Sequence, residues 1–316
     1  MGLYIVRRVL LTLPMLFLVS LVTFILMRII PGDVVSILYQ DSSLTLQQIA
    51  DVRHQLGMDQ PAYVQYFEWI GGILRLDAGV SLWTKRPVFQ EIAFRLPVTL
   101  ELAFLAFVGQ LLIAIPVGVL AATNQDKPQD QVARLLAIVT AAMPDFWIAT
   151  MALVTLVSVF GWIPPIGGVT PFLEDPLYNL QQFVLPALIL SLTGAASLTR
   201  YMRNQLLEVI RQDYIRTAFA KGLARQRVWY GHALRNAMIP VVTNAGSQLG
   251  YLLGGTVIIE NIFSLPGIGQ LTLTAIQHRD IPQLEINVLF IAVVFVTVNL
   301  LVDLSYAWLD PRIRFS

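Results

Sequence analysis

The segment Asp213–Val242, with the sequence DYIRTAFAKGLARQRVWYGHALRNAMIPVV, is cationic and lies between two long apolar stretches. Ile215, Phe219 and Leu223 recur every four residues, and this spacing places them on one side of a helix. Gly222 allows either a close approach of two backbones or a reversal of the chain. The segment therefore predicts a short amphipathic helix followed by a turn, both in a polar surrounding between the two apolar stretches.

The composition of the 316 residues indicates a membrane protein. Apolar residues make up 56% of the chain and charged residues 13%, whereas an ordinary soluble chain has about 25% charged residues. The net charge of +1 implies no electrostatic attraction to nucleic acid. Because cysteine is absent, disulfides, thiolate metal sites and cysteine nucleophiles are excluded. We expect an all-α polytopic protein that contacts membrane lipid.

A helix that crosses the bilayer needs about 20 mostly apolar residues. The first candidate is longer than the apolar region of a signal peptide, so we expect it to remain in the protein as a spanning helix. Arg28, at its end, is expected to reach lipid headgroups. The sequence predicts six spans, at about residues 9–30, 100–122, 132–160, 183–198, 239–259 and 286–308.

The basic residues are distributed unevenly over this predicted topology. With six spans and a cytoplasmic N-terminus, most Lys and Arg residues lie in the cytoplasmic segments. The positive-inside rule then places both termini in the cytoplasm. The predicted organisation is a first span at 1–30, a periplasmic helical segment at 31–97, a core of five spans at 98–308 with a cytoplasmic loop at 200–236, and a cytoplasmic tail at 309–316.

The outer segment, residues 31–97, is too polar to span the membrane, and its apolar residues recur with the spacing of amphipathic helices. SLTLQQIADVRHQLG, at 43–57, reads as an amphipathic helix that Ser43 or Thr45 caps and Gly57 ends. QPAYVQYFEWIGGILRL, at 60–76, reads as a second helix with aromatic residues on one face. We expect these helices to form a small cap on the outer surface.

Several short motifs occur in a fixed order along the chain. They are PGD at 31–33, LGMDQP at 56–61, RLPVTLELA at 95–103, RTAFAKG at 216–222, LPGIGQL at 265–271 and RDIP at 279–282. The ordered set covers nearly the whole chain and resembles the permease subunits of binding-protein-dependent ABC importers. Arg216, Thr217 and Ala218 stand where the general family motif has Glu-Ala-Ala, and Gly222 stands at its Gly. The departures at Arg216 and Thr217 are typical of the dipeptide, oligopeptide and nickel branch, and Arg235 replaces a later Pro.

The resemblance implies a type I ABC importer permease fold and a role for each part of the cytoplasmic loop. The loop would be the coupling helix that sits in a cleft on an ATP-binding subunit. Its contact residues would be Arg216, Thr217, Ala218, Phe219, Ala220, Lys221, Gly222 and Leu223.

The resemblance also implies the partners and the cargo. The partners would be a homologous second permease, two ATP-binding subunits and a periplasmic solute-binding protein, all at a bacterial inner membrane. The chain would hold no cofactor, because ATP and Mg²⁺ bind the partner subunits. The expected cargo is a di- or oligopeptide, with nickel chelates, glutathione and other small solutes as alternatives.

Each candidate residue also has a plainer interpretation. The cations at 213–242 can simply follow the positive-inside bias and contact lipid phosphates. Asp145 can line the translocation path and meet a cationic part of the substrate, or it can cap the second half of a broken helix after Pro144. Glu101 can line the path or lie at the membrane interface, and Asp303 is expected to pair with an Arg.

Three glycines recur every four residues in the fifth predicted span. Gly246, Gly250 and Gly254 form a stripe that lets a second helix approach closely. We expect this stripe to pack against a helix of this chain or of a sister permease.

No constellation of catalytic residues is present in the sequence. It lacks a Gly-x-x-x-x-Gly-Lys-Ser/Thr phosphate loop, a His-Glu-x-x-His pair and a Gly-x-Ser-x-Gly elbow. We therefore expect a non-catalytic subunit. The alternative classes are an ion-coupled secondary transporter that uses Asp145 and Asp303, and a membrane-embedded hydrolase. No inverted repeat supports the former, and no residue set supports the latter.

Overall fold

The computed structural model describes residues 2–29, 47, 59–165 and 168–309. Every regular element in these ranges is a helix, which confirms the all-α expectation. The helices are α1 (Gly2–Ile29), α4 (Ala62–Leu74), α5 (Val88–Thr123), α6 (Pro128–Ala142), α7 (Asp145–Phe160), α8 (Pro176–Ile210), α9 (Asp213–Ala220), the π-helix η1 (Arg227–Ala233), α10 (Leu234–Ile262), α11 (Ile268–Gln277) and α12 (Ile281–Leu309).

Four helices in the described residues are long and apolar enough to cross a membrane, namely α1, α5, α8 and α12. The pair α6 and α7 makes a fifth crossing if it is one broken span. The helix α10 covers the predicted span at 239–259 but is less apolar. The total of six spans therefore stays a prediction, while the polytopic architecture is clear.

The third predicted span is not one continuous helix. The helices α6 and α7 meet at Met143 and Pro144 and are bent by 98° relative to each other. Pro144 supplies no backbone N–H, and its ring disfavours helical backbone at the preceding residue. Met143 is accordingly extended, with φ −94° and ψ 128°. The predicted span at 132–160 is therefore two helices broken at Pro144, and its crossing of the membrane as one broken span stays a prediction.

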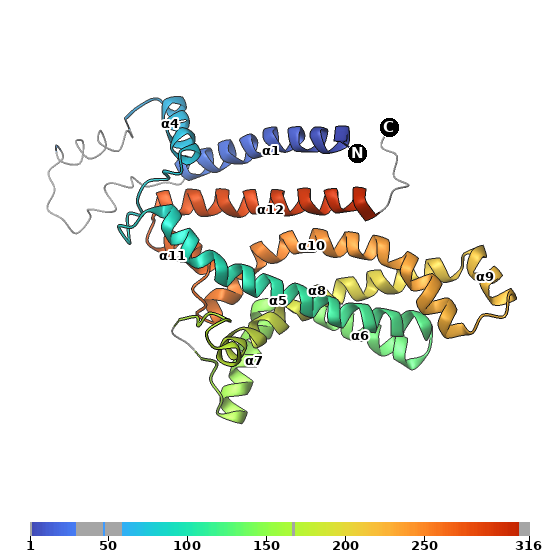
Figure 1. Cartoon of the computed structure of the whole chain (residues 1–316). Helices are drawn as coiled ribbons and strands as arrows, with labels where there is room; N and C mark the ends of the chain where they lie inside the picture. The colour runs from blue at the N-terminus through green and yellow to red at the C-terminus, as the bar shows by residue number, and fades with distance from the viewer. Residues whose placement is uncertain (1, 30–46, 48–58, 166–167, 310–316) are drawn as a thin grey trace.

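The core of the molecule forms where α5 and α8 run side by side, with α10 packed across them. Leu102, Phe183 and Ile259 are fully buried in one cluster of this core. Met202 and Ala237 are fully buried in a second cluster, nearer to α9. The first helix, α1, packs only at the edge, against α12 and α4 (Figure 1).

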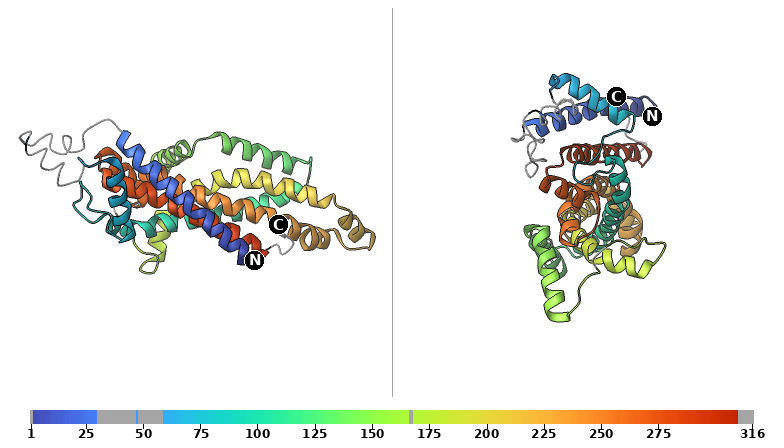
Figure 2. Two further views of the ribbon diagram at one scale, coloured as in Figure 1. Left: turned by 90° about the horizontal axis from the view of Figure 1, so that it is seen from above. Right: turned by 90° about the vertical axis from the view of Figure 1, so that its left-hand side faces the viewer.

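The molecule is elongated, and its two ends differ (Figure 1, Figure 2). One end carries α4 and α11. The opposite end carries α9, and the N-terminal end of α1 and the C-terminal end of α12 face the same way. The helix axes between these ends follow the direction in which the predicted spans would cross the bilayer.

The outer cap contains the predicted helix at 60–76, which the structure places at α4. Tyr66 of this helix is buried between Phe17 and Phe24 of α1, and its hydroxyl lies 2.8 Å from Ser20 Oγ. Tyr63 and Phe67 of α4 remain exposed. The predicted helix at 43–57, the PGD motif and the tail at 310–316 lie outside the described residues, apart from residue 47.

Arg28 does not serve only as a lipid anchor. Its guanidinium lies 3.1 Å from the Glu285 carboxylate of α12 and donates to Gln65 of α4 at 2.9 Å. It also stacks over the ring of Phe24. Sequence reasoning considered only headgroups because Glu285 lies far along the chain, and the structure shows that Arg28 ties three helices together.

Candidate functional site

The short helix α9 is closed at its C-terminal end by a Schellman motif. The Leu223 N–H donates to Ala218 O at 3.4 Å, and the Gly222 N–H donates to Phe219 O at 2.9 Å. Gly222 has φ +78°, the left-handed conformation that this motif requires. No atom lies within 4 Å of the position that a Cβ on Gly222 would take. Gly222 therefore reverses the chain, and it makes no close backbone contact within the described residues.

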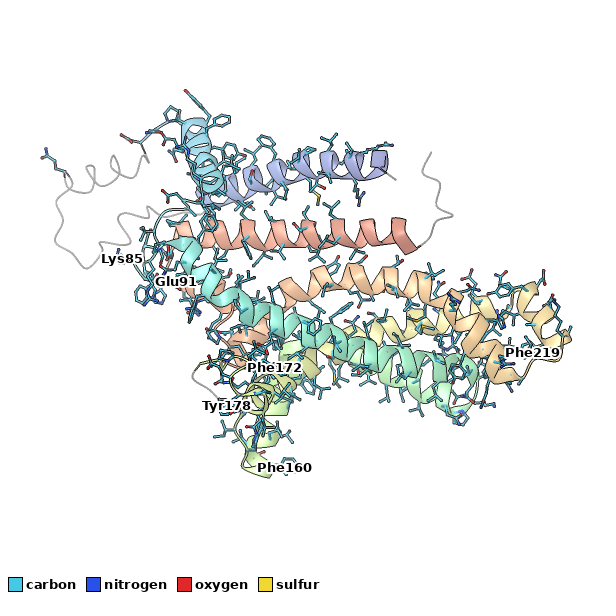
Figure 3. All side chains as sticks on the ribbon, viewed as in Figure 1. Lys85, Glu91, Phe160, Phe172, Tyr178 and Phe219 are labelled. Atoms are coloured by element: carbon cyan, nitrogen blue, oxygen red, sulfur yellow. The ribbon has the colours of Figure 1, made fainter. Side chains whose placement is uncertain are left out.

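The apolar side of α9 is divided between this chain's own core and the surface. Ile215 is fully buried in the cluster that contains Val228 and Ala237. Leu223 packs against the same cluster and is partly buried. Phe219 is 40% exposed and lies at the far tip of the molecule (Figure 3). The predicted docking face thus anchors α9 to its own protein through Ile215, and Phe219 is the large apolar side chain of that face that stays exposed.

Charged side chains surround this tip. Arg216 and Lys221 are exposed, and the nearest anion to Arg216 is Asp213, 3.5 Å away and almost fully exposed. Arg225 stacks over the Trp229 ring at 3.9 Å. An open cleft of about 480 Å³ lies beside the start of α9 and is lined by Asn204, Leu207, Glu208, Arg211, Gln212 and Asp213. We define the exposed residues of α9 and its turn, Asp213–Leu223, as the tip surface.

A buried ion pair fixes the helices next to this tip surface. Asp130, at the start of α6, is fully buried and lies 2.6 Å from Arg203 of α8. The Asp126 N–H also donates to the Asp130 carboxylate at 3.0 Å. Sequence reasoning missed this pair, since Asp130 and Arg203 are 73 residues apart and neither belongs to a motif.

Asp145 and Glu101, both predicted to line a path, are not brought together. Asp145 is the first residue of α7, Pro144 is the N-cap, and no side-chain capping hydrogen bond forms. The carboxyl group of Asp145 lines an open cleft between α5, α7, α8 and α10. Glu101 lies elsewhere on α5, beside the side chain of Asn179. The side chain of Asp303 lies outside the described part of the structure.

Two of the three glycines in the predicted stripe face α12 of this chain. A Cβ on Gly246 would lie 2.8 Å from Val302, and one on Gly250 would lie 2.8 Å from the Phe295 ring. Gly254 has open space around it in the described residues. The helix that approaches the first two glycines is therefore within this chain.

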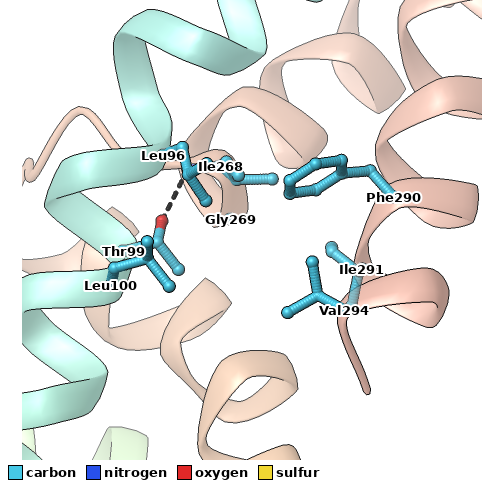
Figure 4. Close-up of a pocket in the computed structure, with 8 residues that line it drawn as sticks. All are labelled: Leu96, Thr99, Leu100, Ile268, Gly269, Phe290, Ile291 and Val294. Atoms are coloured by element: carbon cyan, nitrogen blue, oxygen red, sulfur yellow. Dashed lines mark hydrogen bonds between the residues drawn. The ribbon is translucent and has the colours of Figure 1, made fainter. Parts of the chain in front are cut away.

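The LPGIGQL motif encloses a buried carboxylate that sequence reasoning did not identify. Glu260 of α10 is fully buried, and its carboxylate accepts from Thr99 Oγ1 at 2.8 Å and from Gln270 N at 3.0 Å. Thr99 in turn accepts from the Ile268 N–H (Figure 4). A Cβ on Gly267 would overlap both Glu260 and Thr99. The motif thus holds the start of α11 on α5 and α10.

The pocket beside Thr99 in Figure 4 is too small to be a ligand site. It measures about 20 Å³, room for one water, and its lining is almost entirely apolar. The chemistry of this region is therefore structural.

The RDIP motif performs a similar structural role between α11 and α12. Asp280 is buried and accepts from Ser81 Oγ at 2.5 Å and from Leu82 N at 3.0 Å. The rings of Trp83 and His278 stack at 3.5 Å. These contacts fasten the loop before α5 onto the connection between α11 and α12.

Comparison with known proteins decides the family. Residues 114–315 match the family described as binding-protein-dependent transport system inner membrane component, and residues 1–103 match its N-terminal companion. The chain belongs to this family. It is therefore a multi-pass inner membrane protein and the permease component of a transporter.

Relatives of this permease match it from end to end. A protein of Brucella abortus (strain 2308) is 41% identical over 99% of both chains, and its name describes it as a peptide transport system permease protein. The dipeptide transport system permease protein DppB of Escherichia coli (strain K12) is 39% identical over 98% of both chains. A solved amino acid ABC transporter shares the fold alone, with a TM-score of 0.56, 15% identity, and coverage of 70% of this chain and 94% of that chain.

Proposed function

We propose that this permease is the membrane subunit of an ATP-driven importer of di- or oligopeptides. Its relatives over nearly the whole chain are named for peptide or dipeptide transport. The cleft beside Asp145 provides polar groups inside the membrane-spanning bundle. A solute path needs such groups, because apolar helices alone offer nothing to replace water around a peptide.

The tip surface at Asp213–Leu223 is the proposed contact with the ATP-binding subunit. The observation that carries this proposal is the position of α9: it projects beyond the bundle and exposes Phe219 among cations (Figure 3). Its base is held by Ile215 and by the Schellman motif, so a push on the tip is passed to α8 and α10. A rigid, anchored lever is what transmission of a subunit motion requires.

The remaining partners follow from this arrangement. A homologous second permease completes the path, two ATP-binding subunits bind ATP and Mg²⁺, and a periplasmic binding protein delivers the solute. The permease itself performs no covalent chemistry and holds no cofactor. The end with α9 and the two termini faces the cytoplasm, and the end with α4 and α11 faces the periplasm.

A site-directed crosslink tests the assigned tip. The chain has no native cysteine, so Phe219→Cys creates a single reactive thiol. We expect a short bifunctional crosslinker to trap the ATP-binding subunit in membranes of the native host. Leu173→Cys is the control, because Leu173 is 94% exposed and lies next to Phe172, before the start of α8 and far from the tip (Figure 3). Equal trapping at both positions, or none at Phe219, would contradict the assignment.

A reconstitution experiment tests the activity. The permease is purified with the second permease, the ATP-binding subunits and the binding protein that its genome encodes, and is placed in proteoliposomes. We expect uptake of dipeptide only with ATP and the binding protein. Gradient-driven uptake by the permease alone would instead support the secondary transporter.

A further inference from the structure

The strongest unassigned feature is the open cleft that contains Asp145. Its volume is about 320 Å³, which falls at the lower end of the range of small-molecule sites, about 300–1,000 Å³. Four helices, α5, α7, α8 and α10, contribute to its wall. The lining combines apolar and polar side chains: Gln110, Asp145, Leu190, Thr193, Gly194, Ser197, Gln248, Tyr251 and Leu252.

The Asp145 carboxylate has no partner in the described residues. It is partly exposed and enters no ion pair or hydrogen bond in that part of the chain. Its place in the first turn of α7 lets the helix dipole stabilise a negative charge there. A carboxylate among membrane-spanning helices is costly unless a cation or a donor reaches it. The Asp145 carboxylate is therefore available to a cationic group of a ligand.

Gln110 provides a second unsatisfied group at the same cleft. Its side chain is fully buried, and its Nε2 donates to Gln248 Oε1 at 2.5 Å. Its Oε1 has no hydrogen-bond partner within the described residues. That oxygen lies over Gly194, where a Cβ would collide with it. Because glycine has no side chain, position 194 leaves room for the unpaired acceptor Gln110 Oε1.

The bond between Gln110 and Gln248 joins two carboxamides across α5 and α10. A peptide group has the same carbonyl acceptor as a carboxamide and one N–H donor in place of two, so it can take over the hydrogen bond that either partner makes in this pair. Gln248 is the more accessible of the two and is also bonded to Asn244 at 2.7 Å. Because Gln248 is partly exposed and Gln110 is fully buried, Gln248 is the side chain able to move aside.

We propose that this cleft is a subsite for the amino-terminal end of a peptide. The ammonium group contacts Asp145, and the first peptide group replaces one carboxamide of the Gln110–Gln248 pair. This proposal rests on the proposed transport function and adds a recognition step inside the permease. It specifies a free amino terminus and a peptide bond as the features that are read.

Direct binding measurements without the binding protein test the subsite. The complex of permeases and ATP-binding subunits is titrated with dialanine, N-acetyl-dialanine and the depsipeptide analogue in which an ester replaces the peptide bond. We expect dialanine to bind most tightly. Asp145→Asn should weaken dialanine about 10- to 100-fold and leave the N-acetyl compound unchanged. Gln110→Leu should weaken dialanine about 2- to 10-fold and should weaken the depsipeptide less, because the ester has no N–H to donate to Gln110 Oε1.

Thr150→Ala is the matched control, because Thr150 is on the exposed side of α7 and, among the described residues, its hydroxyl bonds only to Phe146 O. It should bind all three compounds like the wild type. Peptide uptake by the complete transporter is measured in parallel. Normal uptake with no binding of dialanine, or with an Asp145→Asn variant that binds like the wild type, overturns the subsite alone. Absence of peptide uptake in the wild type overturns the transport function and the subsite with it.

Discussion

Arg203 donates two hydrogen bonds, each 2.6 Å long, to the two carboxylate oxygens of Asp130. The pair is bidentate, and Asp130 is fully buried while Arg203 is 14% exposed. It joins the start of α6 to the part of α8 that leads to the tip surface. The broken pair α6 and α7 is thereby fastened at the end that lies nearest the tip surface (Figure 1).

Removal of one member of this pair is expected to be severe. Asp130→Asn leaves the Arg203 guanidinium without its counter-charge, which costs about 3–5 kcal/mol for a buried pair. We expect a large drop in the thermal unfolding midpoint of the purified protein. Asp213→Asn is the control, because its partner Arg216 and Asp213 itself are both largely exposed and such pairs contribute little. Similar midpoints for the two variants would show that the Asp130 pair is not structural.

Gly269→Ala is expected to destabilise the packing of α11 on α10. A Cβ at Gly269 would lie 2.5 Å from the backbone Cα of Val257, an atom that cannot move without displacing α10. Overpacking of this kind costs about 1–3 kcal/mol. Gly254→Ala, with open space around it, should be neutral or slightly stabilising. Thermal unfolding distinguishes the two, and equal stability would refute the close contact.

Gly222→Val is expected to uncouple transport from ATP hydrolysis. The residue needs φ +78°, which a β-branched side chain adopts only under strain. Gly222→Asn is the control, since Asn tolerates the left-handed region. We expect binding-protein-stimulated ATP hydrolysis and uptake to fall in the Val variant and to persist in the Asn variant. Normal coupling in the Val variant would count against the coupling role.

A size exchange tests the packing of α10 on α12. Gly250→Ala places a methyl group 2.8 Å from the Phe295 ring, so we expect a loss of stability of about 1–3 kcal/mol. Phe295→Ala creates a cavity and is destabilising on its own. The double variant should be more stable than the sum of the two losses predicts, because the methyl group enters that cavity. Strict additivity in thermal unfolding would exclude direct contact.

Local patterns predicted a large part of the structure. The apolar residues spaced by four in the segment after Asp213 predicted α9, which the structure contains. The aromatic segment at 60–76 predicted α4, which the structure also contains. The turn at Gly222 also follows from local chemistry. Pro144 indicated that the helix is interrupted, but it did not indicate the bend of 98° between α6 and α7. A proline in a membrane helix gives only a kink when the neighbouring residues continue the helical path.

Long-range contacts were the part that local patterns missed. Glu260 sits at the end of an apolar run and gives no local sign of its partners, Thr99 and Gln270. Arg28 was assigned to lipid because Glu285 is 257 residues away. In each case the sequence contains both groups, but only the packing of helices brings them within hydrogen-bond distance.

The order of apolar runs, the uneven placement of Lys and Arg and the ordered motifs were sufficient to establish an all-α membrane permease and its family. These properties are local or compositional, so they can be read without coordinates. Tertiary structure alone decided that Ile215 anchors α9 inwards while Phe219 remains free, and that Asp145 meets Gln110 and Gln248 at one cleft. The physical reason is that burial depends on which helix lies opposite, and that choice is made by the whole fold.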